Sequence, residues 1–347
     1  MTDDPLLLPL LKTGYFTHDC VAIEGPRIAC PPEGFIDVEA APGGGSMASP
    51  ESPERLDKIE ELMIATGLED RVRRYEAGPA DVADVLLAHD PDYVEALRRA
   101  SEGDEEALER FSEPDSPVGP KTYEAAMKSV GAVVSAVNEV LSSRLQNAFC
   151  AIRPPGHHAK RDKAGGFCFF NNVAVGALHA MKVHGIRRVL VVDFDVHHGD
   201  GTESILGGVD GVQFHSLFQW PLFPSVLPEE KPSNVYRLPL PAGTTGAELL
   251  EAVKTAWTRA IDRFAPELIL VSAGFDAHTE EKMAQLKLGE ADFASLTRWL
   301  MDFAERHASG RIVSVLEGGY SLRCLARSVL SHLNTMVRYS EKDRCSM

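Results

Sequence analysis

Short, continuously apolar segments alternate with longer segments of helical periodicity along this sequence. The segments expected to be strands are 148–152, 188–195, 212–217, 268–276 and 312–317, and those expected to be helices lie near 80–111, 121–143, 171–184, 245–263, 291–308 and 321–338. A strand that is apolar throughout is buried on both faces, which happens when helices cover both sides of a parallel sheet. We therefore predict a three-layer α/β fold with a parallel central sheet and helices on both faces.

The distribution of proline and glycine indicates the domain organisation. Residues 31–50 are rich in both and are predicted to form a long N-terminal loop. Beyond residue 50, no stretch rich in proline, glycine and serine divides the chain, and no internal repeat is visible. We expect residues 1–347 to form a single domain.

The charge balance argues against some classes of partner. Asp and Glu number 51 and Lys and Arg 35, which gives a formal net charge of −16. Such a surface repels phosphate backbones and anionic lipids, so we expect no nucleic-acid or membrane binding. No apolar run approaches the ~20 residues of a membrane span, and the acidic N-terminus is unlike a secretory signal. The six cysteines have no paired spacing, which favours reduced thiols and a cytoplasmic location.

Polar clusters follow four of the expected strands at their carboxyl ends. These clusters are Arg153–His158, Asp193–Asp200, Gly274–His278 and Glu317–Tyr320. In open parallel sheets, ligands bind beyond the carboxyl ends of the strands. The sequence therefore predicts one site at this edge of the sheet, supplied with His, Asp and Tyr side chains from separate strands.

The second and third clusters contain candidate metal ligands. Asp195 and His197 are two residues apart in an extended segment, so their side chains can point the same way, and Asp276 can supply a third ligand. Two carboxylates, one imidazole and an open position are typical of a catalytic metal site, because structural zinc sites are closed by four protein ligands. A metal there lowers the pKa of bound water and polarises a carbonyl. The same donors also suit iron(II).

The remaining polar residues are candidates for proton transfer and oxyanion binding. His157 and His158 can serve as base and acid, with Asp193 and Asp200 placed to orient the two imidazoles. Tyr320 follows two glycines and can donate a hydrogen bond to a developing oxyanion. A His pair, an Asp-x-His motif or a Gly-Gly-Tyr motif alone is weak evidence for a catalytic site. Only their combination in one chain indicates catalysis.

These motifs resemble the histone deacetylase family, and the resemblance is class II-like. The family includes bacterial histone-deacetylase-like amidohydrolases, acetylpolyamine amidohydrolases and acetoin-utilisation proteins. The matching stretches, in family order, are Arg153–His158, Gly166–Asn172, Asp193–Thr202, Ser272–His278 and Glu317–Tyr320, with weaker matches at Ser52–Leu56 and from Asp115 through Tyr123 to Ala126. The family's N-terminal His-Pro-Glu-Arg-like motif appears as Ala48-Ser49-Pro50-Glu51, which is a departure.

The resemblance implies an arginase/deacetylase-like fold and a deacetylase-like catalytic domain with one zinc ion. It implies Asp195, His197 and Asp276 as zinc ligands. His158 would be the general base and acid, Asp193 would orient His157, and Asp200 would orient His158. Tyr320 would polarise the substrate carbonyl.

The resemblance also implies how substrate and a second ion bind. Gly166, Phe167 and Phe223 would line a narrow tunnel, and Asp115 would bind substrate at its mouth. Met283 falls where polyamine-selective relatives carry an acidic gatekeeper, which makes a polyamine less favoured. A structural potassium ion would bind to backbone carbonyls of Asp193, Asp195, His197 and Leu217 and to the hydroxyl of Ser216.

The sequence thus predicts zinc-dependent hydrolysis of an N-acyl amide, with acetyl-lysine or a related acylated amine as substrate. An acetylpolyamine or another small N-acyl amine is the alternative substrate. A two-manganese ureohydrolase would need a second bridging carboxylate, where this chain has Asp276-Ala277-His278. A non-catalytic acyl-ligand binding protein is a further alternative, and a homo-oligomer stays open.

Overall fold

The computed structural model describes residues 11–19 and 49–342. The loop predicted at 31–50 therefore lies outside the described residues, apart from Ser49 and Pro50. The strands are β1 (Thr13–Thr17), β2 (Arg73–Glu76), β3 (Asn147–Cys150), β4 (Val189–Asp193), β5 (Val212–Gln219), β6 (Val235–Leu240), β7 (Leu268–Ala273) and β8 (Ile312–Leu316). The helices are α1 (Glu54–Thr66), α2 (Val82–Val85), α3 (Pro91–Ser101), α4 (Glu105–Glu109), α5 (Thr122–Leu141), α6 (Asn172–His184), α7 (Asp200–Leu206), α8 (Gly246–Phe264), α9 (Glu290–His307) and α10 (Leu322–Lys342), with a 3₁₀ turn at Glu69–Arg71.

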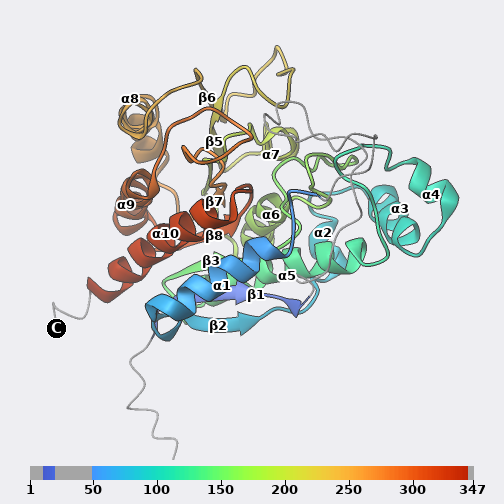
Figure 1. The fold of residues 1–347 in the computed structure, drawn as a ribbon, viewed down its shortest axis with the longest axis horizontal. Coiled ribbons are helices and arrows are strands. Elements are labelled where there is room, and N and C mark those ends of the chain that lie inside the picture. The colour runs from blue at the N-terminus through green and yellow to red at the C-terminus, as the bar shows by residue number, and fades with distance from the viewer. Residues whose placement is uncertain (1–10, 20–48, 343–347) are drawn as a thin grey trace, which may run out of the picture.

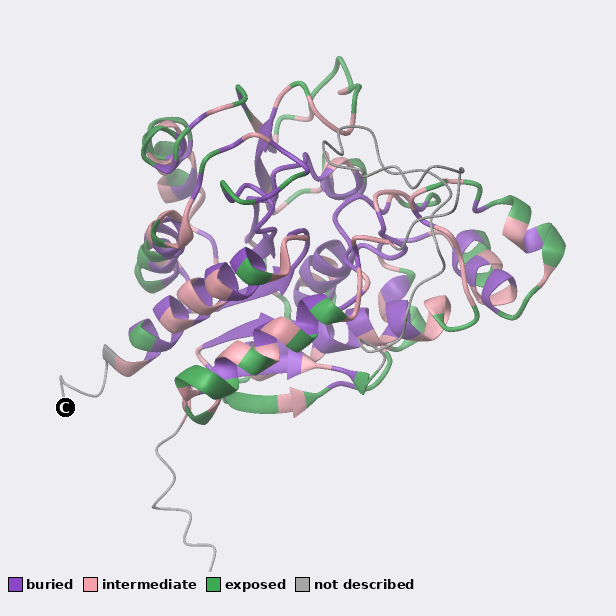
Figure 2. Cartoon of the chain, in the orientation of Figure 1, coloured by how far each residue is buried: buried purple, intermediate pink, exposed green. Residues whose placement is uncertain are grey.

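All eight strands form one parallel sheet in the order β2-β1-β3-β8-β7-β4-β5-β6. Helices α1, α8, α9 and α10 pack on one face, and α3, α5, α6 and α7 contribute to the core on the other (Figure 1). The central strands are buried throughout (Figure 2). The predicted three-layer α/β fold is confirmed. None of the helices in the described part of the chain is long and apolar enough to span a membrane.

Alternate residues of one strand supply the two cores. In β4, Leu190 and Val192 belong to the core under α8 to α10, whereas Val189 and Val191 belong to the core under α5 and α6. All four of these residues are fully buried. This two-sided burial accounts for the continuous apolar runs in the sequence, because no face of these strands meets water.

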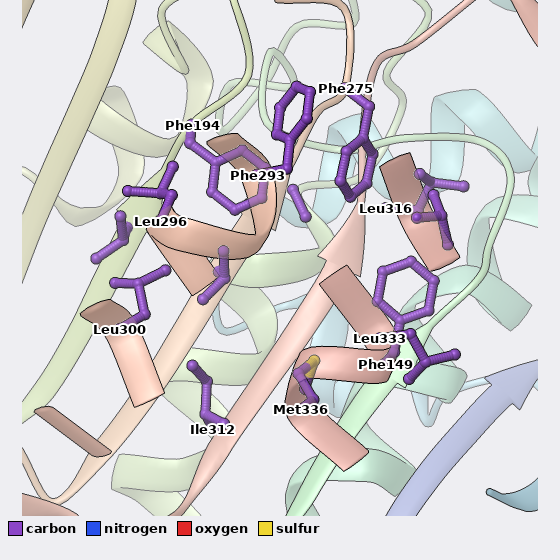
Figure 3. Close-up of a cluster of buried hydrophobic side chains, with 14 of the residues drawn as sticks. Phe149, Phe194, Phe275, Phe293, Leu296, Leu300, Ile312, Leu316, Leu333 and Met336 are labelled. Carbon is purple, nitrogen blue, oxygen red and sulfur yellow. The ribbon is translucent and has the colours of Figure 1, made fainter. Parts of the chain in front are cut away.

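A cluster of phenylalanines fixes the ends of β4 and β7 (Figure 3). The ring of Phe194 lies 5.7 Å from that of Phe275, and the ring of Phe293 on α9 lies 5.1 Å from Phe275. Phe194 lies between Asp193 and Asp195 in the sequence, and Phe275 directly precedes Asp276. The apolar packing of each Phe therefore fixes the backbone that carries the neighbouring carboxylates.

Two parts of the fold differ from the prediction. The region 80–111 forms three short helices, because Asp90-Pro91 starts a new helix and Asp104 caps another after Gly103. Strands β1, β2 and β6 were not predicted. Strand β2 is largely exposed at the sheet edge and carries charged residues, and β6 at the opposite edge contains Pro239.

Candidate active site

In the segment after β4, the aspartate side chains accept hydrogen bonds from the backbone of the same segment. The backbone N–H of Asp195 donates to Asp193 Oδ1 (3.1 Å), and the N–H of His197 donates to Asp195 Oδ1 (2.9 Å). Both aspartates are fully buried. Carboxylates two residues apart thus satisfy successive backbone donors and hold the turn that presents His197.

Three of the predicted residues converge as a candidate metal site. Ligand atoms of Asp195, His197 and Asp276 all lie within 4.8 Å of one another. His197 Nδ1 lies 3.0 Å from Asp195 Oδ1 and 3.2 Å from Asp276 Oδ2. Asp276 Oδ1 accepts the N–H of Val196 (3.0 Å), but no described residue donates a hydrogen bond to the buried Asp276 Oδ2. A buried carboxylate oxygen without a donor, beside a second carboxylate and an imidazole, fits a divalent cation.

Glycine makes room for these carboxylates. A Cβ on Gly318 would lie 2.2 Å from Asp276 Oδ2 and 2.6 Å from Asp195 Oδ2, and a Cβ on Gly274 would lie 2.0 Å from Asp195 Oδ2. The N–H of Gly318 donates to Asp195 Oδ2 (2.8 Å). The first glycine after Glu317 is therefore needed for close approach to the site, rather than only for a flexible turn.

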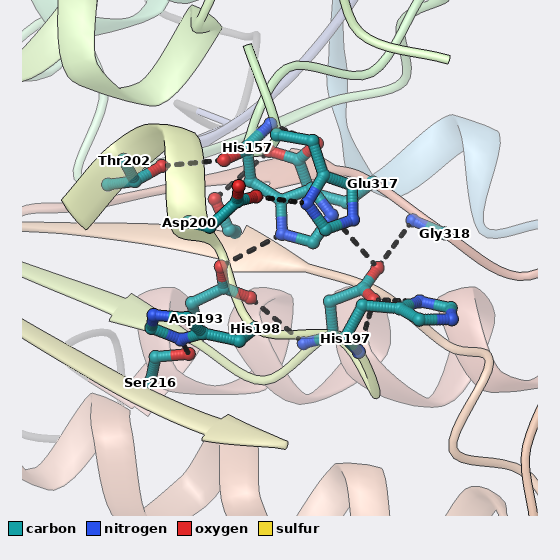
Figure 4. Close-up of polar contacts among 12 residues, drawn as sticks. His157, Asp193, His197, His198, Asp200, Thr202, Ser216, Glu317 and Gly318 are labelled. Atoms are coloured by element: carbon teal, nitrogen blue, oxygen red, sulfur yellow. Dashed lines mark hydrogen bonds and ion pairs between the residues drawn. The ribbon is translucent and has the colours of Figure 1, made fainter. Parts of the chain in front are cut away.

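The His pair after β3 is oriented by the two predicted aspartates (Figure 4). His157 Nδ1 lies 2.9 Å from Asp193 Oδ2, and His158 Nδ1 lies 2.8 Å from Asp200 Oδ1. The two imidazole rings are 4.0 Å apart, and Nε2 of His157 is 3.8 Å from Asp195 Oδ2. Both imidazoles therefore lie beside the candidate metal site, each held by its own carboxylate.

The environment pushes the pKa values of the two imidazoles apart. Burial disfavours charge on His157, but the nearby carboxylates, Asp193 above all, hold its pKa well above the usual value. Burial, reinforced by the neighbouring His157, lowers the pKa of His158 to about 4. His158 is thus neutral at pH 7 and can accept a proton, whereas His157 is suited to remain charged.

Tyr320 is half-buried beside the site. Its ring lies 5.7 Å from that of Phe167, and the guanidinium of Arg55 lies 5.1 Å from its centroid. Arg55 is fully buried and donates through Nε to the carbonyl of Gly319 (2.7 Å) and through Nη2 to the carbonyl of Glu317. The loop that carries Tyr320 is therefore held from α1.

Glu317 is a site residue to which the sequence assigned no role. Its Oε2 accepts the N–H groups of Gly156 (2.7 Å) and His157 (3.2 Å), and its Oε1 accepts the hydroxyl of Ser272 (3.0 Å). Burial raises the pKa of Glu317 to about 7. Its place at the end of β8 was the available signal, but its partners come from the loop after β3 and from β7.

A second group without a predicted role is built on Glu51. This carboxylate, 8% exposed, accepts from Arg55 Nη1 (3.0 Å), from Arg153 Nε (2.6 Å) and from Arg153 Nη2 (2.9 Å). Arg153 precedes the His pair, while Arg55 holds the loop of Tyr320. Glu51 therefore contributes a carboxylate that joins both loops.

Phe223, Gly166 and Asp115, which are expected around the substrate, lie next to the His pair or to one another. The ring of Phe223 is 4.8 Å from His158 and 6.3 Å from His197. The N–H of Gly166 donates to Asp115 Oδ2 (3.2 Å), and a Cβ on Gly166 would lie 2.3 Å from the His158 ring. Met283 is buried, and its exposed fraction is 4%. Two aromatic rings thus flank the predicted catalytic residues, Phe223 at the imidazoles and Phe167 at Tyr320.

The residues expected to bind potassium are also neighbours. Asp193 on β4 pairs in register with Ser216 on β5. The hydroxyl of Ser216 lies 2.9 Å from His198 Nδ1, and His198 Nε2 lies 2.9 Å from Glu203 Oε2. Potassium binding by Asp193, Asp195, His197, Ser216 and Leu217 stays a prediction.

A second group with metal-like spacing is made of His278, Glu280 and Glu290. Its chemistry does not fit a metal. His278 Nδ1 accepts the N–H of Glu280 (3.0 Å), so the hydrogen of a neutral ring is on Nε2, the atom that faces Glu290. Arg327 forms ion pairs with both glutamates. This group is a contact held by Arg327 between the loop of Glu280, α9 and α10.

Comparison with known proteins identifies the family. The histone deacetylase domain model matches residues 49–336, which is most of the chain. The chain belongs to the histone deacetylase family. The Pseudomonas aeruginosa protein named histone deacetylase-like amidohydrolase is 37% identical over 305 residues, covering 86% of this chain and 78% of that protein. A probable deacetylase of Archaeoglobus fulgidus is 34% identical, covering 79% of this chain and 78% of that protein.

Two further comparisons extend this assignment. The mouse protein named polyamine deacetylase HDAC10 is 35% identical over 83% of this chain, but the match spans only 45% of that protein. The crystal structure of the HDA15 HD domain superposes with a TM-score of 0.81 and 24% identity, covering 94% of this chain and 89% of that one. The predicted deacetylase-like fold is confirmed, and the relatives support deacetylase or amidohydrolase activity.

Proposed function

We propose that this protein is a zinc-dependent deacylase that hydrolyses the N-acyl amide of an acylated lysine or a related acylated amine. One observation carries the proposal. The buried Asp276 Oδ2, which accepts no hydrogen bond from any described residue, lies with Asp195 and His197 directly beside two imidazoles that are each oriented by a carboxylate. A purely structural role does not account for this arrangement, because a buried carboxylate oxygen without a donor costs stability.

Asp195, His197 and Asp276 would hold the metal ion. When bound, the ion supplies Lewis-acid chemistry, which polarises the substrate carbonyl and makes water more acidic. Two carboxylate oxygens and one imidazole nitrogen leave an open fourth position, as in catalytic metal sites, and we assign zinc from the resemblance to the histone deacetylase family. Iron(II) also suits these donors.

The protein's own residues move the protons. Neutral His158 takes a proton from the attacking water and returns it to the departing amine. His157, charged beside Asp193, stabilises negative charge that develops nearby. The Tyr320 hydroxyl donates to the oxygen of the substrate carbonyl as it gains charge. Asp193 and Asp200 keep the imidazoles in place through their contacts at Nδ1.

The aromatic walls favour an acylated alkyl amine as the proposed substrate. Gly166, Phe167 and Phe223 would line the approach, and Asp115 would contact substrate at its mouth. An acylated lysine carries no charge on its side-chain nitrogen, so its methylenes can pass between the rings with a gain of about 0.8 kcal/mol per buried CH₂.

An acetylpolyamine is the second candidate substrate. The resemblance to mouse polyamine deacetylase HDAC10 favours it. Met283 disfavours it, because a buried thioether at this position offers no negative charge to a polyamine ammonium.

We also propose one catalytic domain, a potassium ion bound near Ser216, and a cytoplasmic location without nucleic-acid partners.

The test is turnover of a substrate panel by zinc-loaded protein and its Tyr320→Phe variant. The panel contains acetyl-lysine peptides, acetylpolyamines and longer acyl-lysines. We expect acetyl-lysine turnover that falls about 10²–10³-fold in the variant, while zinc content stays at one per chain. Zinc-loaded protein that is inert across the panel would contradict the deacylase proposal, and two metals per chain would favour a ureohydrolase.

A further inference from the structure

The loop between Asp276 and Met283 touches the Tyr320 segment through one carboxylate. Oε2 of Glu281 accepts the N–H of Tyr320 (2.7 Å) and the N–H of Ser321 (3.0 Å). Its Oε1 accepts the N–H of Lys282 (2.9 Å), so both oxygens have partners. Glu281 is 9% exposed, which makes these hydrogen bonds sheltered from water.

The backbone before Tyr320 cannot fix this residue by itself. Gly318 and Gly319 precede it, and Gly319 has a φ of +118°, a conformation that side-chain-bearing residues rarely adopt. The direction of Tyr320 therefore depends on groups that hold the segment from outside. Arg55 holds the carbonyl side of this segment, and Glu281 holds its N–H side.

The position of Glu281 also suits its charge. Tyr320 and Ser321 directly precede α10, a helix of 21 residues. The N–H of Leu325 donates to the carbonyl of Ser321 (2.9 Å), so the first turn of this helix begins there. Unpaired N–H groups at the start of a helix carry partial positive charge, which a carboxylate stabilises.

We infer that Glu281 is a positioning residue for Tyr320, which links the loop bearing Asp276 and Met283 to the oxyanion-binding phenol. The inference rests on the proposed function, since it assigns Tyr320 to the reaction. Glu281 contacts neither the candidate metal ligands nor the two imidazoles by any hydrogen bond in the described structure. Among the described residues, its side-chain hydrogen bonds outside its own loop are those to Tyr320 and Ser321, so we expect its effect on turnover to pass through Tyr320.

The experiment is a double-mutant cycle with Glu281→Ala and Tyr320→Phe, measured as kcat and KM on an acetyl-lysine peptide with zinc-loaded protein. Displacement of a catalytic group by about 1 Å can cost up to ~10² in rate. We expect Glu281→Ala to lower kcat about tenfold to a hundredfold, with little change in KM and zinc content. In the Tyr320→Phe background, we expect Glu281→Ala to lower kcat by less than about twofold.

Two further variants make the test specific. Glu280→Gln removes a charge from the same loop, but this side chain is exposed and pairs with Arg327, so we expect wild-type kcat. Glu281→Gln retains one acceptor oxygen, so its kcat is expected to lie between those of the wild type and Glu281→Ala. If Glu281→Ala does not fold, Glu281→Gln replaces it in the cycle.

The outcomes separate this inference from the proposed function. A loss of kcat that is equally large with and without the Tyr320 hydroxyl would overturn the positioning role, as would a folded Glu281→Ala enzyme with wild-type kcat. If Tyr320→Phe alone leaves turnover unchanged, the role of Tyr320 in the proposed function is wrong and Glu281 has no phenol to position.

Discussion

Gly318 offers a direct test of the candidate metal site, because its replacement by alanine changes only the space beside two carboxylates. The added Cβ would lie 2.2 Å from Asp276 Oδ2 and 2.6 Å from Asp195 Oδ2. Real Cβ atoms essentially never approach other heavy atoms more closely than 3.0 Å. The Asp276 oxygen must therefore withdraw by about 0.8 Å, which far exceeds the tolerance of about 0.2 Å in metal–ligand distances.

The expected result is a weaker metal site in a folded protein. Disturbing groups that merely orient ligands costs about 10–100-fold in metal affinity. Because Gly318→Ala moves the ligands themselves, we expect a loss of at least about 100-fold. The measurement is bound zinc at buffered free-zinc concentrations, accompanied by kcat and by circular dichroism to establish folding.

A matched glycine provides the control. No heavy atom lies within 4 Å of a Cβ built on Gly78, and its backbone is outside the left-handed region. Gly78→Ala should bind zinc as the wild type does. A folded Gly318→Ala protein that binds one zinc with wild-type affinity would show that Asp195 and Asp276 are not the ligands.

Three further predictions concern stability. Phe293→Ala removes a ring that packs on Phe194 and Phe275, and it should lower the free energy of unfolding in urea by about 3–5 kcal/mol; a loss below about 1 kcal/mol would contradict this packing role. Removing the metal with a chelator should lower Tm, and zinc should restore it; an unchanged Tm in metal-depleted protein would count against the site. Burial lowers the pKa of His89 to about 4, so the unfolded chain binds the proton below pH 6.5 while the folded chain does not. Stability is thus lost as pH falls from about 6.5 to about 4, by about 2 kcal/mol at pH 5, and urea titrations should show a smaller loss for His89→Gln.

The convergence of Asp195, His197 and Asp276 could be predicted from sequence, because these residues follow buried strands in a fixed alternation. Phe194 and Phe275 point into the core beside α9, and this leaves Asp195 and Asp276 directed away from it. Their apolar neighbours are visible in the sequence, and so is the period of two. The same logic predicted the central strands, since burial on both faces leaves a continuous apolar run.

The supporting contacts could not be predicted in this way. Glu51, Glu281 and Glu317 each act on loops that are distant in sequence, and a lone glutamate after a proline or in a loop has no pattern that identifies its partner. The edge strands could not be predicted for a related reason. Strand β2 is stabilised on one side only and carries charged residues, so its sequence lacks the apolar signal that marks a buried strand.

The cluster of buried carboxylates around the site is unfavourable for folding unless its negative charge is offset. Asp193, Asp195, Asp276 and Glu317 are all fully buried. Burial, with the adjacent Asp195 charge, raises the pKa of Asp276 to about 6. Hydrogen bonds and one imidazolium offset part of this repulsion, but like charges in a low dielectric disfavour folding. A divalent cation between Asp195 and Asp276 would offset their mutual repulsion, so the ion that the proposed chemistry requires should also stabilise the strand ends that hold it.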